Sequence, residues 1–185
     1  MPSTPPANGP RSADGTPPAS GPRSVGEPRS ASDPRWLDQE EMAAWRGFVA
    51  ASNLLNRRLE RQLKEDSGLS HTQYEILVHL SAAPAGSLRM TELAEKLITS
   101  KSGLTYQVTQ LERMGLVGRR SCPSDVRGVF AELTDEGREM LRQAAPGHVA
   151  LVRELLIDVL SREQLAVLAE GLGEVSARLR LEDRA

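Results

Sequence analysis

Cysteine, aromatic residues and long apolar runs are all scarce in this sequence, and each scarcity excludes a class of protein. The single cysteine, Cys122, rules out an intramolecular disulfide. No apolar run reaches the roughly 18 residues that cross a bilayer, and the N-terminus lacks the apolar stretch of a signal peptide. Aromatic residues make up only 3% of the chain, so Leu, Val, Ala and Ile must fill the core. We therefore expect a soluble, cytoplasmic protein with a mainly helical core and no membrane contact.

Residue patterns typical of enzymes are also missing. His71 and His79 lie on one predicted helix but are too far apart in sequence, because a zinc-binding pair on a helix needs a spacing of four. No glycine-rich phosphate loop and no nucleophile elbow occur. We expect no catalytic residues, no metal site and no cofactor, and the sequence predicts that the protein is not an enzyme.

Positive charge is concentrated in one part of a chain whose net charge is -2. Residues 89–128 contain more Lys and Arg than Asp and Glu, whereas acidic residues exceed arginines in residues 129–185. Affinity for nucleic acid depends on where the charge lies and not only on its sum. The distribution fits a DNA-reading module set in a neutral or acidic frame.

The first 34 residues differ in composition from the rest of the chain. They hold nine of the 12 prolines and repeat the motif Pro-Arg-Ser, a composition that buries too little apolar surface to offset the entropy of ordering. We interpret residues 1–34 as a disordered tail. Beyond it, apolar residues recur at steps of three and four from Trp36 to the approach to Ser67 and predict a long amphipathic helix.

The middle of the chain alternates short helices with a hairpin. Ser70 and Gln73 form a capping box for a second helix ending at Ala82. A short stretch at 87–89 leads to a third helix over 90–97, and a fourth runs from 100 to 114. Two strands are predicted at 117–122 and 129–133, separated by residues 123–128.

Two helices complete the predicted fold. Thr134 caps a helix that we expect to run to Leu160 with a bend near Pro146. Ser161 and Gln164 form a second capping box before the last helix. That helix has a heptad seam of apolar residues: Leu165, Leu168, Leu172, Val175 and Leu179.

The fourth helix has the residues expected of a DNA-reading element. Leu104, Val108 and Leu111 define its buried face. Lys101 and the helix N-terminus at Ser100 favour phosphate. The opposite face carries side chains able to bond base edges in a major groove: Ser102, Thr105, Tyr106, Thr109 and Gln110. An ordinary solvated helix face remains the alternative.

The hairpin adds positive charge next to this helix. Asp125 and Arg127 are two residues apart, so the carboxylate could brace the guanidinium as it projects into a minor groove. Arg119 and Arg120 are predicted to contact phosphates nearby. A turn stabilised by an Asp–Arg pair, without DNA contact, remains the alternative.

These stretches resemble a known family. Residues 97–117, reading LITSKSGLTYQVTQLERMGLV, are similar to the recognition helix and exit turn of MarR (multiple antibiotic resistance regulator) proteins. Residues 121–128 (SCPSDVRG) and 133–137 (LTDEG) look like the family's wing and the start of its fifth helix. The resemblance covers about residues 40–180. Departures occur at Tyr106, Gln110 and Val126, where arginines are common in the family.

The resemblance implies a mainly α fold with a small β-wing: a winged helix-turn-helix domain joined to an interlaced helical dimerisation domain. The expected parts are an N-terminal dimerisation helix at 36–66, a winged DNA-binding domain at 67–138 and C-terminal dimerisation helices at 139–182. It further implies a homodimeric repressor on a pseudo-palindromic site in double-stranded DNA. The apolar stripes of the first and last helices agree, because the small winged domain cannot cover them.

The resemblance also implies release from DNA by a small aromatic or phenolic ligand. Trp45, Phe48, His71 and Tyr74 lie on segments that would line its pocket, although rings at helical spacing also occur as plain core. Three alternatives stay open: an oxidant sensor that uses Cys122 beside several arginines, a metal sensor, and a winged helix that binds only proteins.

Overall fold

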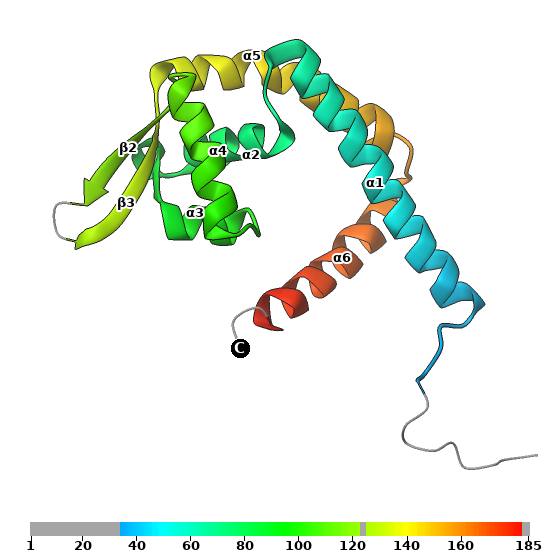
Figure 1. Ribbon diagram of the computed structural model, residues 1–185. Coiled ribbons are helices and arrows are strands. Elements are labelled where there is room, and N and C mark those ends of the chain that lie inside the picture. Colours follow the sequence, from blue (N-terminus) through cyan, green and yellow to red (C-terminus); the bar gives the residue numbers. More distant parts are fainter. Residues whose placement is uncertain (1–33, 123–124, 183–185) are drawn as a thin grey trace, which may run out of the picture. The chain divides into compact units, whose positions relative to one another are not determined.

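The computed structural model describes residues 34–122 and 125–182, and the side chains of residues 122–127 lie outside the description. The chain divides into two units, residues 1–38 and 39–185, and the helices and strands belong to the second. The predicted tail, residues 1–34, lies almost wholly outside the described residues. The elements in Figure 1 are α1 Gln39–Ser67, α2 His71–Ala82, β1 Ser87–Arg89, α3 Met90–Lys96, α4 Lys101–Arg113, β2 Val117–Cys122, β3 Asp125–Leu133, α5 Asp135–Val152 and α6 Arg162–Glu182.

A three-stranded antiparallel sheet in the order β1-β3-β2 lies beside α2, α3 and α4 and completes the winged unit. The predicted hairpin of β2 and β3 is present, but β3 begins at Asp125 because Cys122 pairs with Asp125 and extends the ladder into the predicted loop. The strand β1 was missed. Three residues are too few to show an alternating pattern, and β1 becomes a strand only through its pairing with β3.

The hydrophobic core lies inside the winged unit and extends to the end of α1. Leu104, Val108 and Leu111 of α4 are fully buried, which confirms the buried face predicted from their spacing. Leu63 of α1 and Ala144 of α5 join the same cluster. Burying one such leucine contributes about 1.5 to 3 kcal/mol, so these contacts fix the winged unit against the long helices.

Side-chain caps start the helices where the sequence placed them. At α2 the Ser70 hydroxyl accepts from the Gln73 N–H at 3.2 Å, and the Gln73 side chain accepts from the Ser70 N–H at 2.9 Å. Ser100 caps α4 in the same way through the N–H of Gly103 at 3.1 Å. Thr134 caps α5, its hydroxyl accepting from the N–H of Gly137 at 3.0 Å. Each cap contributes about 1 kcal/mol and sets the first residue of its helix.

The long helices differ from the predicted bounds at two places. The helix α1 begins at Gln39, three residues after Trp36, with Glu40 and Glu41 in its first turn, where negative charge suits the positive end of a helix. The helix α5 continues through Pro146, ends at Val152 and is followed by a π-helical turn, Arg153–Ile157. The predicted end at Leu160 was therefore wrong, whereas the bend near Pro146 stays a prediction.

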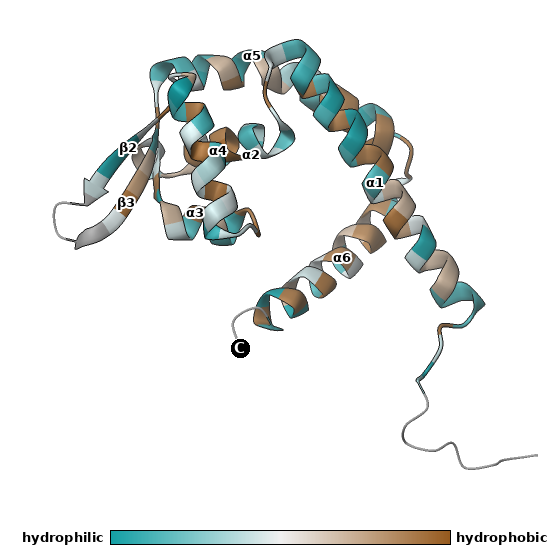
Figure 2. Cartoon of the chain, in the orientation of Figure 1, coloured by the Kyte–Doolittle hydropathy of each residue, from teal (hydrophilic) through white to brown (hydrophobic). Residues whose placement is uncertain are grey.

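An apolar seam runs along α6 and is bare in the single chain. The predicted capping box is present, with the N–H of Ser161 donating to Gln164 at 2.9 Å and the N–H of Gln164 donating to Ser161 at 3.2 Å. Among the residues that the structure describes, none of α6 is buried, and Val175 in the seam is 54% exposed. Figure 2 shows apolar residues along α6 and along α1, so both helices present surface that this chain does not cover.

Candidate nucleic-acid interface

The helix α4 presents the polar face that the sequence predicts. Ser102, Thr105 and Tyr106 are exposed, with 61% of the surface of Tyr106 accessible. Thr109 and Gln110 are half-buried further along the same helix. An α-helix of this width fits the major groove of B-form DNA, where such side chains can meet base edges. The geometry places the five residues on one element, and their contact with bases stays a prediction.

Two threonine hydroxyls on α4 already donate hydrogen bonds to carbonyl groups of the helix backbone. The Thr105 hydroxyl donates to the Lys101 carbonyl at 2.7 Å, and the Thr109 hydroxyl donates to the Thr105 carbonyl at 2.8 Å. Their oxygens remain acceptors and their methyl groups remain apolar. In a major groove such side chains would accept from the amino groups of adenine or cytosine, or touch the methyl group of thymine.

The start of α4 combines a cap with a positive charge. The Ser100 oxygen accepts from the Gly103 N–H and lies 3.2 Å from the hydroxyl of Ser102. Ser100 is therefore occupied as the cap, whereas Lys101 is exposed beside the first backbone N–H groups of the helix. This end of α4 is suited to a phosphate.

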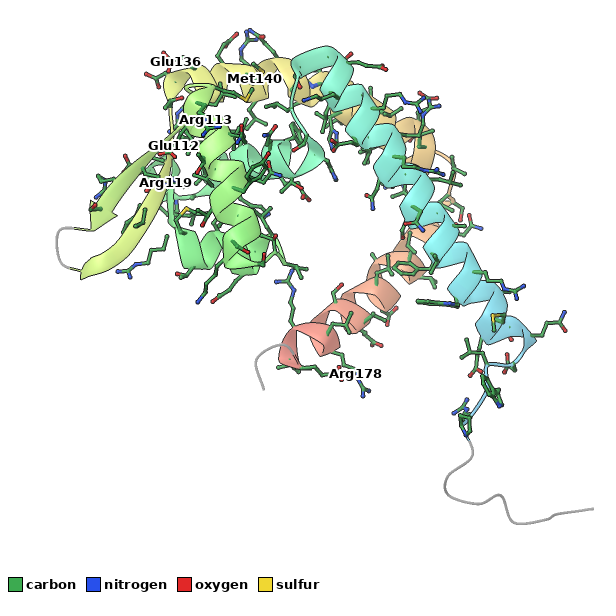
Figure 3. All side chains as sticks on the ribbon, in the orientation of Figure 1. Glu112, Arg113, Arg119, Glu136, Met140 and Arg178 are labelled. Carbon is green, nitrogen blue, oxygen red and sulfur yellow. The ribbon has the colours of Figure 1, made fainter. Side chains whose placement is uncertain are left out.

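Arg119 points toward α4. Its Nη1 lies 2.8 Å from the Oε2 of Glu112, and its Nη2 donates to the Thr105 carbonyl at 3.0 Å and to the Thr109 hydroxyl at 3.1 Å. Figure 3 labels Arg119 and Glu112 next to each other where β2 meets α4. This ion pair was not predicted from the sequence.

Arg120 lies on the opposite face of the same strand. Its Nε is 2.5 Å from the Oε1 of Glu132, and its guanidinium stands over the ring of Phe130 at 5.3 Å. Arg89 of β1 stands over the same ring, also at 5.3 Å. Because Phe130 pairs in register with Arg89 on one side and Arg120 on the other, the three side chains form one row across the sheet. Strand alternation would have revealed this row had β1 been recognised.

A groove of about 480 Å³ separates α4 from the sheet. Arg89, Lys101 and Arg119 are among the residues that line it, together with Leu104 and Val129. Asp125 and Arg127 belong to β3 nearby, but their side chains, like that of Cys122, lie outside the described residues. The predicted brace between Asp125 and Arg127 therefore stays a prediction.

The four residues predicted to line a ligand pocket fall into two pairs. Trp45 and Phe48 are exposed on the first half of α1, with ring centroids 6.4 Å apart. His71 and Tyr74 lie on α2 and pack against His148 of α5, with centroid distances of 5.6 and 4.4 Å. Phe48 is twelve residues from Glu60, which contacts His71, and that separation is about 18 Å along a helix. The single chain does not bring the pairs together.

The three-ring cluster at the junction of α1, α2 and α5 contains unusual polar groups. Burial, and then repulsion from His71, lowers the pKa of His148, and burial raises the pKa of Tyr74. The Nδ1 of His148 and the Oε1 of Gln62 are buried and have no hydrogen-bond partner in the described part of the chain. His148 was not selected from the sequence, because its partners are distant along the chain.

The lowered pKa predicts that acid destabilises the protein. Below pH 6.5 the unfolded chain binds a proton at His148 more readily than the folded chain does, so stability falls from pH 7 toward the lowered pKa. We expect the urea midpoint to fall between pH 7.5 and 5.5, and to fall less in His148→Gln. His79→Gln serves as the control, and an equal fall in all three proteins would contradict the prediction.

No helix in residues 34–122 and 125–182 is both long and apolar enough to span a membrane. Within the same residues, His, Cys, Asp and Glu side chains do not gather in threes as a metal site requires.

A helix with a polar outer face, set beside a basic three-stranded wing, defines a winged helix-turn-helix protein. The MarR family model matches residues 69–129. The DNA-bound structure of Sco3205, a MarR family regulator from Streptomyces coelicolor, is 47% identical, with a TM-score of 0.76 over 78% of this chain and 91% of that one. AbsC from the same organism is 43% identical, with a TM-score of 0.76 over 80% of this chain and 99% of that one. This chain belongs to the MarR family.

More distant curated relatives agree. The transcriptional regulator MhqR of Bacillus subtilis is 28% identical over 133 residues, which are 70% of this chain and 84% of MhqR. The transcriptional repressor YetL of the same species is 34% identical over 112 residues, 60% of this chain and 66% of YetL. The protein is therefore a DNA-binding transcriptional regulator and not an enzyme.

Proposed function

We propose that the protein is a homodimeric repressor that binds a pseudo-palindromic operator and leaves it when a small aromatic ligand binds. The observation that carries the proposal is the polar face of α4 beside a sheet that carries Arg89, Arg119 and Arg120, next to long helices whose apolar faces are bare. Repression is favoured over activation by the name of YetL. We place the protein in the cytoplasm, together with the DNA that it binds.

The dimer is supported by apolar surface that a single chain leaves exposed. Trp45, Phe48 and Leu54 on α1 and Val175 and Leu179 on α6 are all exposed large apolar side chains. Monomeric soluble proteins rarely leave so many on neighbouring turns. A second copy with the same faces would bury them about a two-fold axis. The two α4 helices would then read half-sites about 10 bp apart.

Release by a ligand is supported by the unpaired polar atoms at the junction of α1, α2 and α5. A phenol hydroxyl could donate to the Oε1 of Gln62 or bond the Nδ1 of His148, and its ring could stack beside Tyr74. Binding there would act on the contact between the winged unit and the long helices, and so on the spacing of the two α4 helices. Titration with salicylate and simple phenols tests this, and an operator affinity unchanged by all of them would count against it.

Three other readings remain as outcomes of the same assays. Loss of operator binding in peroxide that Cys122→Ser prevents would indicate an oxidant sensor. Metal that copurifies and changes affinity would indicate a metal sensor. A chain that binds no DNA but does bind a protein would indicate a winged helix used for protein interaction.

The deciding experiment is selection from random duplex DNA with the purified protein, followed by affinity measurements over a range of salt concentrations. We expect a two-fold symmetric site of about two helical turns. Failure to enrich any sequence, together with weak binding that salt does not change, would reject the proposal.

Arg127→Ala is expected to weaken binding to the selected site. An arginine inserted into a minor groove contributes both charge attraction and groove-width readout, so we expect a loss of about 10- to 100-fold. The measurement is fluorescence anisotropy with the selected duplex, and Arg138→Ala, an exposed arginine at the start of α5, is the control. Equal affinities of Arg127→Ala and the unchanged protein would remove the wing tip from the interface.

A further inference from the structure

We propose that Arg119 is a positioning residue, which holds the recognition helix α4 in its reading pose, and that it does not contact the DNA. This inference rests on the proposed DNA binding and differs from the role predicted from sequence, where Arg119 was a phosphate contact.

A single guanidinium ties together widely spaced points of α4. It reaches the Thr105 carbonyl and the Thr109 hydroxyl through Nη2, and Glu112 through Nη1. Residues 105 and 112 are seven positions apart, which is about 10 Å along a helix. The planar fork of arginine suits such simultaneous contacts, because its donors are held in fixed directions.

The alternation of β2 explains why Arg119 turns toward the helix. Val117 is buried, and Arg119, two residues later, shares its face of the strand. Arg120 has the opposite face and stands over Phe130. Neighbouring arginines in one strand therefore have different surroundings, one against α4 and the other on the outer row.

Apolar packing alone leaves the pose of α4 less defined. Leu104, Val108 and Leu111 hold the helix to the core, but contacts between aliphatic side chains are non-directional and tolerate small rotations. Directional hydrogen bonds from Arg119 oppose such rotations. They also hold the Thr109 hydroxyl against the helix, because it accepts from Arg119 while donating to the Thr105 carbonyl. Arg119 thus determines how the hydroxyl and methyl groups of Thr109 are oriented toward a base pair.

The two arginines also differ in how accessible their side chains are to a phosphate. The side chain of Arg119 is 29% exposed and paired with Glu112, so a phosphate would have to displace a carboxylate at 2.8 Å. Arg120 is paired as well, through its Nε with Glu132 at 2.5 Å, but its side chain is 50% exposed, so the difference between the two arginines is one of exposure. We therefore assign the phosphate contact to Arg120, which becomes the matched control on the same strand.

The first test is the dependence of affinity on salt. A phosphate contact contributes about 0.9 to the slope of log K against log salt concentration, whereas a positioning residue contributes nothing to it. We expect Arg119→Ala to weaken binding to the selected operator about 10- to 100-fold with an unchanged slope, and to weaken binding to random duplex much less. Arg120→Ala should lower the slope and weaken binding to both duplexes alike.

Two further variants separate charge from geometry. Arg119→Lys keeps the charge but loses the fork, so it should behave like Arg119→Ala if position matters and like the unchanged protein if charge matters. Glu112→Gln should change the affinity for the operator in opposite directions for the two roles of Arg119. Freeing a phosphate-binding Arg119 from its carboxylate would tighten binding, whereas weakening a positioning contact would loosen it. Thermal unfolding of each variant shows whether it is folded.

The inference is overturned if Arg119→Ala lowers the salt slope by about 0.9, or if Glu112→Gln binds the operator more tightly. It is also overturned if Arg119→Ala, shown to be folded, keeps the operator affinity of the unchanged protein. If Arg119→Ala does not fold, Glu112→Gln still decides between the roles. A protein that selects no site at all rejects the proposed function itself, an outcome seen before any variant is made.

Discussion

Val175→Asp in α6 is expected to convert the proposed dimer to a monomer and to abolish binding to the operator. Val175 lies within the seam and is 54% exposed in the single chain. In a symmetric dimer the substitution would place two unpaired carboxylates against apolar surface, at a cost of several kcal/mol. A monomer presents one α4 to one half-site. Losing the linkage between half-sites reduces affinity by about 100-fold or more.

The measurement combines sedimentation equilibrium with operator titration. Ala177→Asp is the matched control, because it adds the same charge to the same helix two residues away, at a position outside the heptad seam. We expect that variant to remain dimeric and to bind as the unchanged protein does. A dimer of undiminished stability in Val175→Asp would show that α6 is not part of the subunit interface.

Features specified by neighbouring residues were predicted well. The predicted caps at Ser70, Thr134 and Ser161 each join residues three apart, so the sequence shows both partners at once. The buried face of α4 follows from a spacing of three and four in the same way. These local signals, with the order of elements, were enough for the fold and for the polar outer face of α4.

Features that join distant residues were not predicted. Arg119 and its partner Thr105 are fourteen residues apart, and only the folded hairpin brings them together. His148 meets His71 and Tyr74 across more than seventy residues. The strand β1 exists through a partner more than forty residues away. A single sequence contains no periodic pattern that links such positions, so the charge of Arg119 was recognised but its direction was not.

The second prediction with a large expected effect concerns the start of α5, where the helix follows strand β3. Gly137 lies in the first turn of α5 against the carbonyl oxygen of Leu116, and a Cβ added at Gly137 would overlap that oxygen and come within 2.7 Å of the Leu133 side chain. Thr134 reinforces the same contact, because its hydroxyl donates to the Gly115 carbonyl at 2.8 Å and its N–H donates to the Leu116 carbonyl at 3.2 Å. The start of α5 is thus fixed to the connection that follows α4.

Gly137→Ala is expected to destabilise the protein, although alanine is the better helix former. The helix preference favours alanine by about 0.5 to 1 kcal/mol, whereas overlap with backbone costs typically about 1 to 3 kcal/mol and sometimes more. Urea unfolding gives the net value. Gly47→Ala is the control, because it lies inside α1 with no atom within 4 Å of the added Cβ and should be neutral or slightly stabilising.

The same substitution should weaken operator binding beyond what partial unfolding explains. Relief of the overlap requires α5 to move away from Leu116, and α5 connects the winged unit to the C-terminal helices. In a dimer that displacement changes the separation of the two α4 helices. A DNA site whose half-sites lie one helical turn apart requires one particular separation. We therefore expect reduced affinity for the two-fold site and little change for a single half-site. Equal losses on both duplexes would place the effect within the winged unit itself.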